Sequence, residues 1–158
     1  GAFFYTDIEH SDLISRKMEI ADNVIPSSNS EMTKNLLFLG HYYYNQAYLS
    51  KATKMLNNVK SDIQNNLYFY ANWGIVEAHH VRSPYELAIV GKRCLEKRKK
   101  LDQNYLPDVL FMGGKNEGKL ELMEGKLIKG ETTMYVCKNK SCRLPVYEVE
   151  QVLEQLKQ

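Results

Sequence analysis

Apolar residues recur at intervals of three and four along the first half of the chain, which is the period of an α-helix. Ser28 is followed by Glu31 three residues later, a capping-box pattern that predicts the start of a helix at Ser28. The periodicity predicts helices over residues 28–44, 49–63 and 67–80. The third stretch is apolar nearly all round, which predicts burial from several sides. Short links between the helices indicate helical hairpins, preceded by an ordered loop.

After Pro84 the pattern changes to short, continuous apolar runs, which are typical of buried parallel strands. Two such runs flank a basic segment with helical spacing, and together they predict a βαβ unit. The predicted elements are strands over 86–91, 108–113 and 132–137, helices over 92–104 and 149–156, and a loop over 114–130. The fold class is therefore α+β, with a helical segment over 1–83 and a small α/β unit over 84–158. Its sheet is expected to be short, three-stranded and mainly parallel.

Composition limits the class of protein without indicating its function. The 158 residues are 44% hydrophobic and 25% charged, as in ordinary globular domains, which excludes wholesale disorder and fibrous folds. No apolar run approaches the roughly 18 residues of a membrane span, so no membrane partner is expected. The net charge of +2 is unevenly distributed. Residues 1–80 hold 6 basic and 8 acidic side chains, and the remainder holds 15 and 11, which again suggests two structural units.

Three cysteines are too few for a disulfide-rich secreted domain, so a reducing compartment, the cytoplasm, is predicted. Cys137 and Cys142 lie five apart at the end of a predicted strand, where Asn139 and Ser141 favour a turn between them. The pair could be two free structural thiols, half of a zinc site or a reversible, redox-active disulfide. Zinc is disfavoured because Cys94 lies on another element and no second pair is present. Nearby basic side chains, which lower a thiol pKa, keep the redox alternative open.

Three further patterns are weak. Residues 113–119 have P-loop spacing, but Leu120 stands where magnesium binding needs a hydroxyl, so a surface turn is favoured. Glu77 and His80 have metal-ligand spacing on a helix, although a pair of helix-end histidines is the simpler interpretation. The basic cluster over 92–100 lacks interleaved aromatics and is better explained as a solvated helix face than as a nucleic-acid site. The sequence thus predicts no metal, no cofactor and no nucleic-acid partner.

The first thirty residues combine aromatic and aliphatic side chains with many titratable ones. Loops of this kind often line pockets, but the same residues can also serve as caps and ion pairs that stabilise a loop. Both alternatives stay open for the acids, the histidine and the guanidinium of this block: Asp7, Glu9, His10, Asp12, Arg16, Glu19 and Asp22.

Three blocks of this sequence carry a resemblance to known proteins. They are residues 1–6 with His10, Leu13, Ile14, Arg16, Glu19, Asp22 and 25–30, then 86–91 with 105–107, and finally 135–146. In these blocks the chain resembles the late region of a family of large bacterial and animal proteins, the thioredoxin-domain proteins related to spermatogenesis-associated protein 20. The resemblance spans essentially the whole chain in order. Ser28 and Met18 depart from the family pattern, which often has a glycine and a lysine there.

The resemblance implies an N-terminal thioredoxin-like domain joined to a six-hairpin (α/α) toroid similar to N-acylglucosamine 2-epimerases and six-hairpin glycosidases. This chain would then be a C-terminal fragment, holding the last hairpins of the toroid and a small α/β appendage. Its first partner would be the N-terminal remainder of the same protein. The chain contains no Cys-x-x-Cys, so the redox site of the thioredoxin-like domain would lie outside it.

Carried over residue by residue, the family's pocket-facing block falls on the N-terminal part of this chain. It implies acid–base catalysis by His10, Glu19 or Asp22, and substrate binding by Asp7, Arg16, Asn29 and Ser30. A carbohydrate ligand and a carbohydrate-active or sugar-isomerising activity of the whole protein are expected by similarity. The alternative is a non-catalytic binding or scaffolding module of a redox protein. The fragment alone is expected to be inactive and to self-associate through uncovered helix faces.

Overall fold

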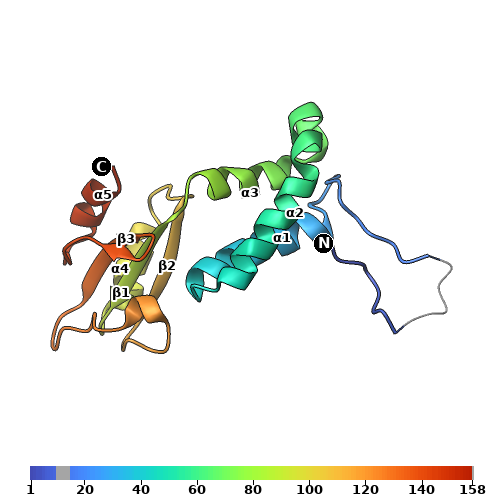
Figure 1. The fold of residues 1–158 in the computed structure, drawn as a ribbon. Helices are drawn as coiled ribbons and strands as arrows, with labels where there is room; N and C mark the ends of the chain where they lie inside the picture. The colour runs from blue at the N-terminus through green and yellow to red at the C-terminus, as the bar shows by residue number, and fades with distance from the viewer. Residues whose placement is uncertain (10–14, 158) are drawn as a thin grey trace. The chain divides into compact units, whose positions relative to one another are not determined.

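The structure is a computed structural model that describes residues 1–9 and 15–157. The chain divides into two compact units, residues 1–82 and 83–158 (Figure 1). The first unit is helical behind an extended N-terminal segment, and the second is built on a sheet. None of the described helices is both long and apolar enough to cross a membrane.

In the first unit, α1 and α2 pack against each other as a helical hairpin, and α3 packs on both (Figure 1). The core of the unit is formed by the faces that these helices turn toward each other, and it includes Leu37, Leu56, Trp73 and Val76. Asn45 caps α2, its side chain accepting hydrogen bonds from two amides of the first turn. The helices are α1 (Ser28–Tyr42), α2 (Gln46–Asn65), the 3₁₀ turn η1 (Leu67–Phe69) and α3 (Ala71–Val81).

Two details of the helical unit differ from the sequence prediction. The N-cap of α1 is Ser27, not Ser28, because it is the Ser27 side chain that accepts a hydrogen bond from the Ser30 amide. The third helix is shorter than predicted and is preceded by the separate turn η1. The stretch predicted as this helix is also not buried on all sides, since Phe69 in η1 and Ile75 in α3 are each 50% exposed.

The second unit contains a four-stranded sheet in the order β2-β1-β3-β4. Its strands are β1 (Tyr85–Val90), β2 (Val109–Gly114), β3 (Thr133–Lys138) and the short β4 (Ser141–Cys142). The prediction of a three-stranded, mainly parallel sheet is wrong, because only β1 and β2 pair in parallel. The stretch between β2 and β3 contains only a 3₁₀ turn, η2 (Glu121–Met123), and no crossover helix. β3 therefore starts at the edge where β1 ends and pairs with it antiparallel.

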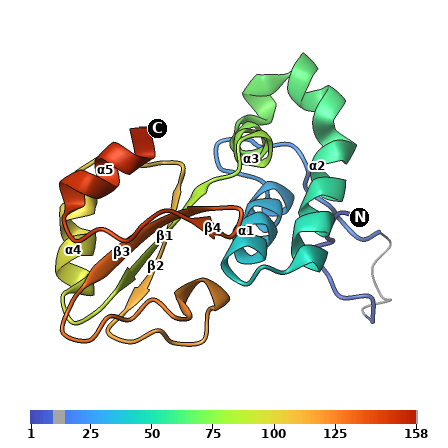
Figure 2. The same cartoon turned by 60° about the vertical axis from the view of Figure 1, so that its left-hand side comes forward.

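Two helices, α4 (Cys94–Leu101) and α5 (Val149–Lys157), cover one face of this sheet (Figure 2). The core between them includes Leu87, Ile89, Met134 and Val136 from the strands. On the other face, η2 packs on β1, so the central strand is buried on both sides, as its continuous apolar run predicts.

Candidate functional site

The carboxylate of Asp22 ties the N-terminal segment to the start of α1. Its Oδ1 accepts hydrogen bonds from the Ser27 amide at 2.8 Å and from the Ser30 hydroxyl at 2.7 Å. Ser27 in turn donates through its hydroxyl to the carbonyl of Ile20 at 2.8 Å. Asp22 therefore holds the turn that caps α1.

The same carboxylate reaches α3, fifty residues further along the chain. Its Oδ2 accepts from the Asn72 amide at 2.9 Å, so one side chain joins the first turns of two helices. Asn72 donates from its side chain to the Ser30 hydroxyl at 2.9 Å. The indole of Trp73 donates to the carbonyl of Ile20 at 2.8 Å. These contacts close a buried polar network, the Asp22 cluster, formed by Asp22, Ser27, Ser30 and Asn72.

The side chain of Asn29 links two stretches of the N-terminal segment, one at Phe3 and the other at Glu19. Its side-chain carbonyl accepts from the Phe3 amide at 2.6 Å, and its amide donates to the carbonyls of Phe3 at 3.0 Å and Glu19 at 2.8 Å. The amide of Tyr5 also donates to the carbonyl of Lys17 at 3.0 Å. Residues 3–6 and 16–20 thus form a ribbon, the N-terminal ribbon, that is anchored on α1.

Burial divides the predicted site residues into two groups. Asp22 is 5% exposed, and Asn29 and Ser30 are 0% exposed, each with its hydrogen bonds made inside the protein. Such groups act structurally, because a buried side chain whose hydrogen bonds are made inside the protein has no donor or acceptor left for a ligand. The members of the predicted set that keep accessible surface in the described chain are Asp7, Arg16 and Glu19.

Glu19 is half-buried on the N-terminal ribbon. Its Oε2 accepts a hydrogen bond from the hydroxyl of Tyr5 and another from the Ser28 amide at 3.2 Å. The Tyr5 hydrogen bond lowers the pKa of Glu19 below its usual range, with help from the Ser28 amide. The same bond raises the pKa of Tyr5. The lowered pKa keeps Glu19 ionised near neutral pH and makes it a weak base, so its carboxylate is suited to accept hydrogen bonds from hydroxyl groups rather than to transfer a proton.

Arg16 belongs to the 16–20 stretch of the ribbon and lies against the 3–6 stretch. Its guanidinium sits 4.2 Å from the centre of the Phe4 ring and donates to the carbonyl of Thr6 at 2.5 Å. The Nε of Arg16 is buried without a hydrogen-bond partner among the described residues. The guanidinium is thus held flat and in one orientation by its stacking, a geometry suited to hydroxyl groups or a carboxylate.

The remaining predicted residues of the block do not join this arrangement in the described structure. Asp7 is exposed, and its carboxylate accepts from the neighbouring amide of Ile8 at 2.5 Å. His10 lies outside the described residues. Arg16 contacts Phe4 and Thr6, whereas Glu19 contacts Tyr5 and Ser28, so no described contact joins the two side chains and their clustering stays a prediction.

The second unit joins the two predicted redox cysteines. Cys137 on β3 faces Cys142 on β4, and their sulfurs form a disulfide. Asn139 and Lys140 between them have φ of 51° and 69°, as in the two-residue type I′ turns that connect hairpins. Cys137 is 1% exposed, whereas Cys142 is exposed. The third cysteine, Cys94, is buried and free.

The weak motifs are accounted for by ordinary structural contacts. Glu77 forms an ion pair with Lys60 at 3.7 Å, and His79 packs edge-on against Phe38 with ring centres 5.2 Å apart. In the described part of the chain, no three histidine, cysteine or acidic side chains gather into a possible metal site. The P-loop-like stretch at the end of β2 forms a turn, and the next element along the chain is the three-residue 3₁₀ turn η2 rather than the α-helix that follows a P-loop.

Sequence reasoning missed two members of the Asp22 cluster. Ser27 carries a signal, since a serine followed by a polar turn is a good N-cap, but the Ser28–Glu31 spacing competes with it. Asn72 carries no local signal, because its partners lie more than forty residues away in the sequence.

Comparisons with protein-family models, with curated proteins and with solved structures find no match to this chain. Its function is therefore inferred from its own residues and contacts, together with the resemblance described above.

Proposed function

We propose that this chain is the C-terminal part of a carbohydrate-active or sugar-isomerising (α/α) toroid protein linked to a thioredoxin-like domain. The observation that carries the proposal is the N-terminal ribbon, on which stacking against Phe4 holds the Arg16 guanidinium and a hydrogen bond from Tyr5 holds the Glu19 carboxylate. An ionised carboxylate accepts hydrogen bonds from the hydroxyl groups of a polyhydroxylated ligand, and a guanidinium donates hydrogen bonds to them. The helical hairpin of α1 and α2 is compatible with the last hairpins of a toroid.

A pocket in such a toroid is shared by many hairpins, so this chain alone is proposed to be inactive. Leu39, Tyr43, Tyr68 and Ile75 on or between the helices are between 41% and 87% exposed. Apolar side chains in such positions are typical of surfaces that pack on other parts of a protein. The N-terminal remainder of the same protein is the proposed partner, and self-association of the isolated chain would substitute for it.

The test uses the whole protein, with its N-terminal remainder, and a panel of monosaccharides. At least one sugar is expected to raise the Tm, because binding to the native state stabilises it. Arg16→Lys keeps the charge but loses the planar fork, and Glu19→Gln removes the ionised acceptor, so each is expected to abolish the shift. Lys17→Ala, an exposed neighbour on the same ribbon, is the matched control and should keep it. A panel without any shift, or a shift that all three variants keep, contradicts the proposal.

The Cys137–Cys142 disulfide favours a second function, in which the chain is a scaffold within a thioredoxin-like redox protein. The thiolate of a dithiol reductant would attack the exposed Sγ of Cys142, the disulfide would break, and Cys137 would leave as a thiolate that takes up a proton. The second thiol of the reductant would then release Cys142 and become part of the reductant's own disulfide. The bond closes only a six-residue loop, whose crosslink contributes about 2 kcal/mol, so the hairpin should survive reduction.

The redox function is tested by treating the protein with reduced thioredoxin and alkylating it under native conditions. Mass mapping should then find label on Cys142, with Cys94 as the buried internal control. A disulfide that stays intact under these conditions, while denatured protein is readily reduced, would contradict exchange and leave the bond a structural crosslink.

A further inference from the structure

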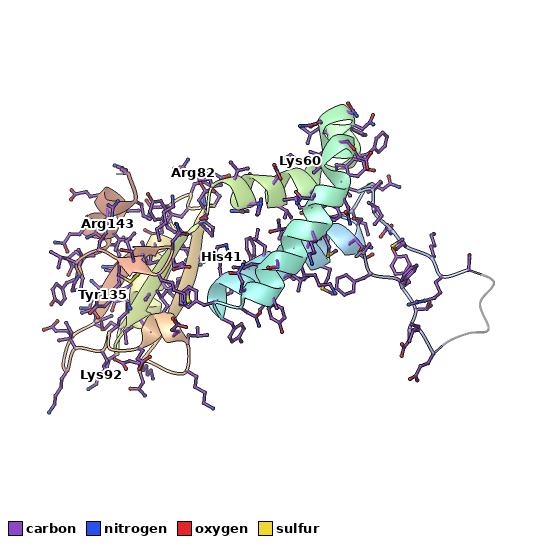
Figure 3. All side chains as sticks on the ribbon, viewed as in Figure 1. His41, Lys60, Arg82, Lys92, Tyr135 and Arg143 are labelled. Atoms are coloured by element: carbon purple, nitrogen blue, oxygen red, sulfur yellow. A yellow bond between two sulfur atoms is a disulfide. The ribbon has the colours of Figure 1, made fainter. Side chains whose placement is uncertain are left out.

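The carboxyl ends of β1 and β2 lie side by side, because the two strands pair in parallel over their whole length. In open α/β sheets, ligands bind outside the carboxyl ends of parallel strands, and β1 and β2 are the parallel pair of this mixed sheet. A lysine lies close after each strand, Lys92 two residues after the end of β1 and Lys115 directly after β2. Figure 3 labels Lys92 beyond the end of β1.

Three hollows adjoin at this edge and share residues. A hollow of about 440 Å³ is lined by Lys92, Lys115 and Lys129. It shares Lys115 with an apolar hollow of about 360 Å³, whose walls include Leu95 and Phe111. It also shares Lys92 with a third hollow of about 250 Å³ next to α5. The three together form one trough, here named the carboxyl-edge trough, that is apolar at one end and basic in the middle.

The charge in the middle of the trough is not neutralised by the protein. Lys92, Lys115 and Lys129 are exposed, and none of them has a hydrogen bond or ion pair with any described residue. Against these three cations the trough offers one exposed carboxylate without such a partner, that of Glu131. Three lysines that line one hollow favour an anion with more than one negative charge.

The other basic residues of this edge are already paired. Arg93 forms an ion pair with Glu96 at 2.6 Å, and the buried Lys97 forms one with Glu148 at 2.8 Å. The Arg93 amide donates to the Thr132 hydroxyl at 3.1 Å. The amides of Gly91 and Arg93 are thus already bonded, to the Gly114 carbonyl and the Thr132 hydroxyl, and the three lysine side chains are the main groups for recognising an anion.

The apolar end of the trough adds a second requirement on the ligand. The Arg98 guanidinium lies 3.5 Å from the centre of the Phe111 ring. Leu95 lines the same hollow and is 69% exposed. A flat apolar group can lie on this wall while an anionic group at its other end reaches Lys115. We infer that the carboxyl-edge trough binds a small phosphate monoester that carries an aromatic or alkyl group.

The test titrates phenyl phosphate, and separately inorganic phosphate, into the ¹⁵N-labelled chain and follows the amide resonances. Saturable shifts are expected at residues 91–93 and 115–116, with phenyl phosphate binding at least fivefold more tightly than inorganic phosphate. Lys115→Ala with Lys129→Ala should weaken both ligands at least tenfold. Lys99→Ala with Lys100→Ala removes the same charge from the exposed face of α4 and should leave both affinities within twofold.

Two further measurements separate the parts of the inference. Leu95→Ser should reduce the advantage of phenyl phosphate while leaving inorganic phosphate unchanged, because only the apolar wall is altered. Benzoate, with a single charge, should bind more weakly than phenyl phosphate. Shifts that do not saturate, or equal losses in the trough and control variants, would show a general charge effect and overturn the site. An oligonucleotide that binds more tightly than phenyl phosphate and loses affinity steeply with salt would overturn the choice of a small ligand.

Discussion

Replacing Asp22 is expected to destabilise the helical unit more than any exposed acid does. The carboxylate accepts from two buried main-chain amides, those of Ser27 and Asn72, and from the Ser30 hydroxyl. The hydroxyl also donates to the Ser27 carbonyl at 2.9 Å, so it keeps a partner when the carboxylate is removed. The two amides lose theirs.

The cost follows from those two amides. A buried donor left without a partner costs about 1–3 kcal/mol, so Asp22→Ala should lower the free energy of unfolding by about 3–5 kcal/mol. Asp22→Asn keeps one oxygen, which can serve the Ser27 amide, but turns an NH₂ group toward the Asn72 amide. One donor is lost instead of two, and the expected loss is about 2 kcal/mol. Asp7→Asn, an exposed control on the same segment, should stay within about 0.5 kcal/mol of the parent.

Urea unfolding, followed by tryptophan fluorescence, measures the difference in the free energy of unfolding of the helical unit. Trp73 is the only tryptophan of the chain, and its indole is bonded to Ile20 in the N-terminal segment. With a urea dependence of about 1 kcal/mol/M for a unit of this size, Asp22→Asn should lower the midpoint by about 2 M. If both Asp22 variants unfold at the same urea concentration as Asp7→Asn, the cluster does not hold the segment, and a catalytic role for Asp22 becomes the better explanation of its position.

Two other predictions concern a pH effect and a backbone position. Glu19 has a lowered pKa, so its contribution to stability is complete above the ordinary glutamate pKa and is lost as the pH falls through the folded value. Tyr5→Phe removes the main cause, and ¹³C NMR titration of the glutamate carboxyls should show the pKa of Glu19 rising toward its ordinary value; an unchanged pKa would contradict the assigned hydrogen bond. At Gly91, with φ of 132°, an added Cβ would meet backbone of the 131–132 segment, 2.7 Å from the Cα of Thr132. Gly91→Ala should therefore destabilise the sheet by more than about 2 kcal/mol, whereas Gly118→Ala, with φ of 69° and open space around it, should cost only about 1 kcal/mol. Hydrogen exchange of the β1 and β3 amides compares the two, and equal exchange rates would contradict the steric argument.

The local elements could be predicted from the sequence because their signals are local. The spacing of Leu49, Leu56 and Ile63 predicts α2, and the structure places that helix over Gln46–Asn65. The runs that form β1 and β2 are short, apolar and separated by a basic helix, which predicts their parallel pairing. These patterns depend only on neighbours within one or two turns of the chain.

The direction of β3 could not be predicted in the same way. Its apolar run fits a strand of either direction, and what decides is the connection from β2, which contains no crossover helix. The glycine-rich, charged stretch between the two strands predicts a loop, and a loop without a crossover helix favours an antiparallel return. The predicted parallel pairing overlooks this constraint, and the predicted number of strands is also wrong, because β4 has only two residues, Ser141–Cys142.

The candidate site shows a deeper limit of sequence reasoning. Asp22 and Glu19 are both acids in the same block, three residues apart, and no property of either residue type separates them. Asp22 is buried because Asn72, fifty residues away, brings the first turn of α3 onto it. Glu19 keeps accessible surface because its partners, Tyr5 and Ser28, lie on the ribbon and at the exposed start of α1. Density of titratable groups therefore predicts that a segment is held by polar contacts, and only the long-range partner decides which of its side chains a ligand can reach.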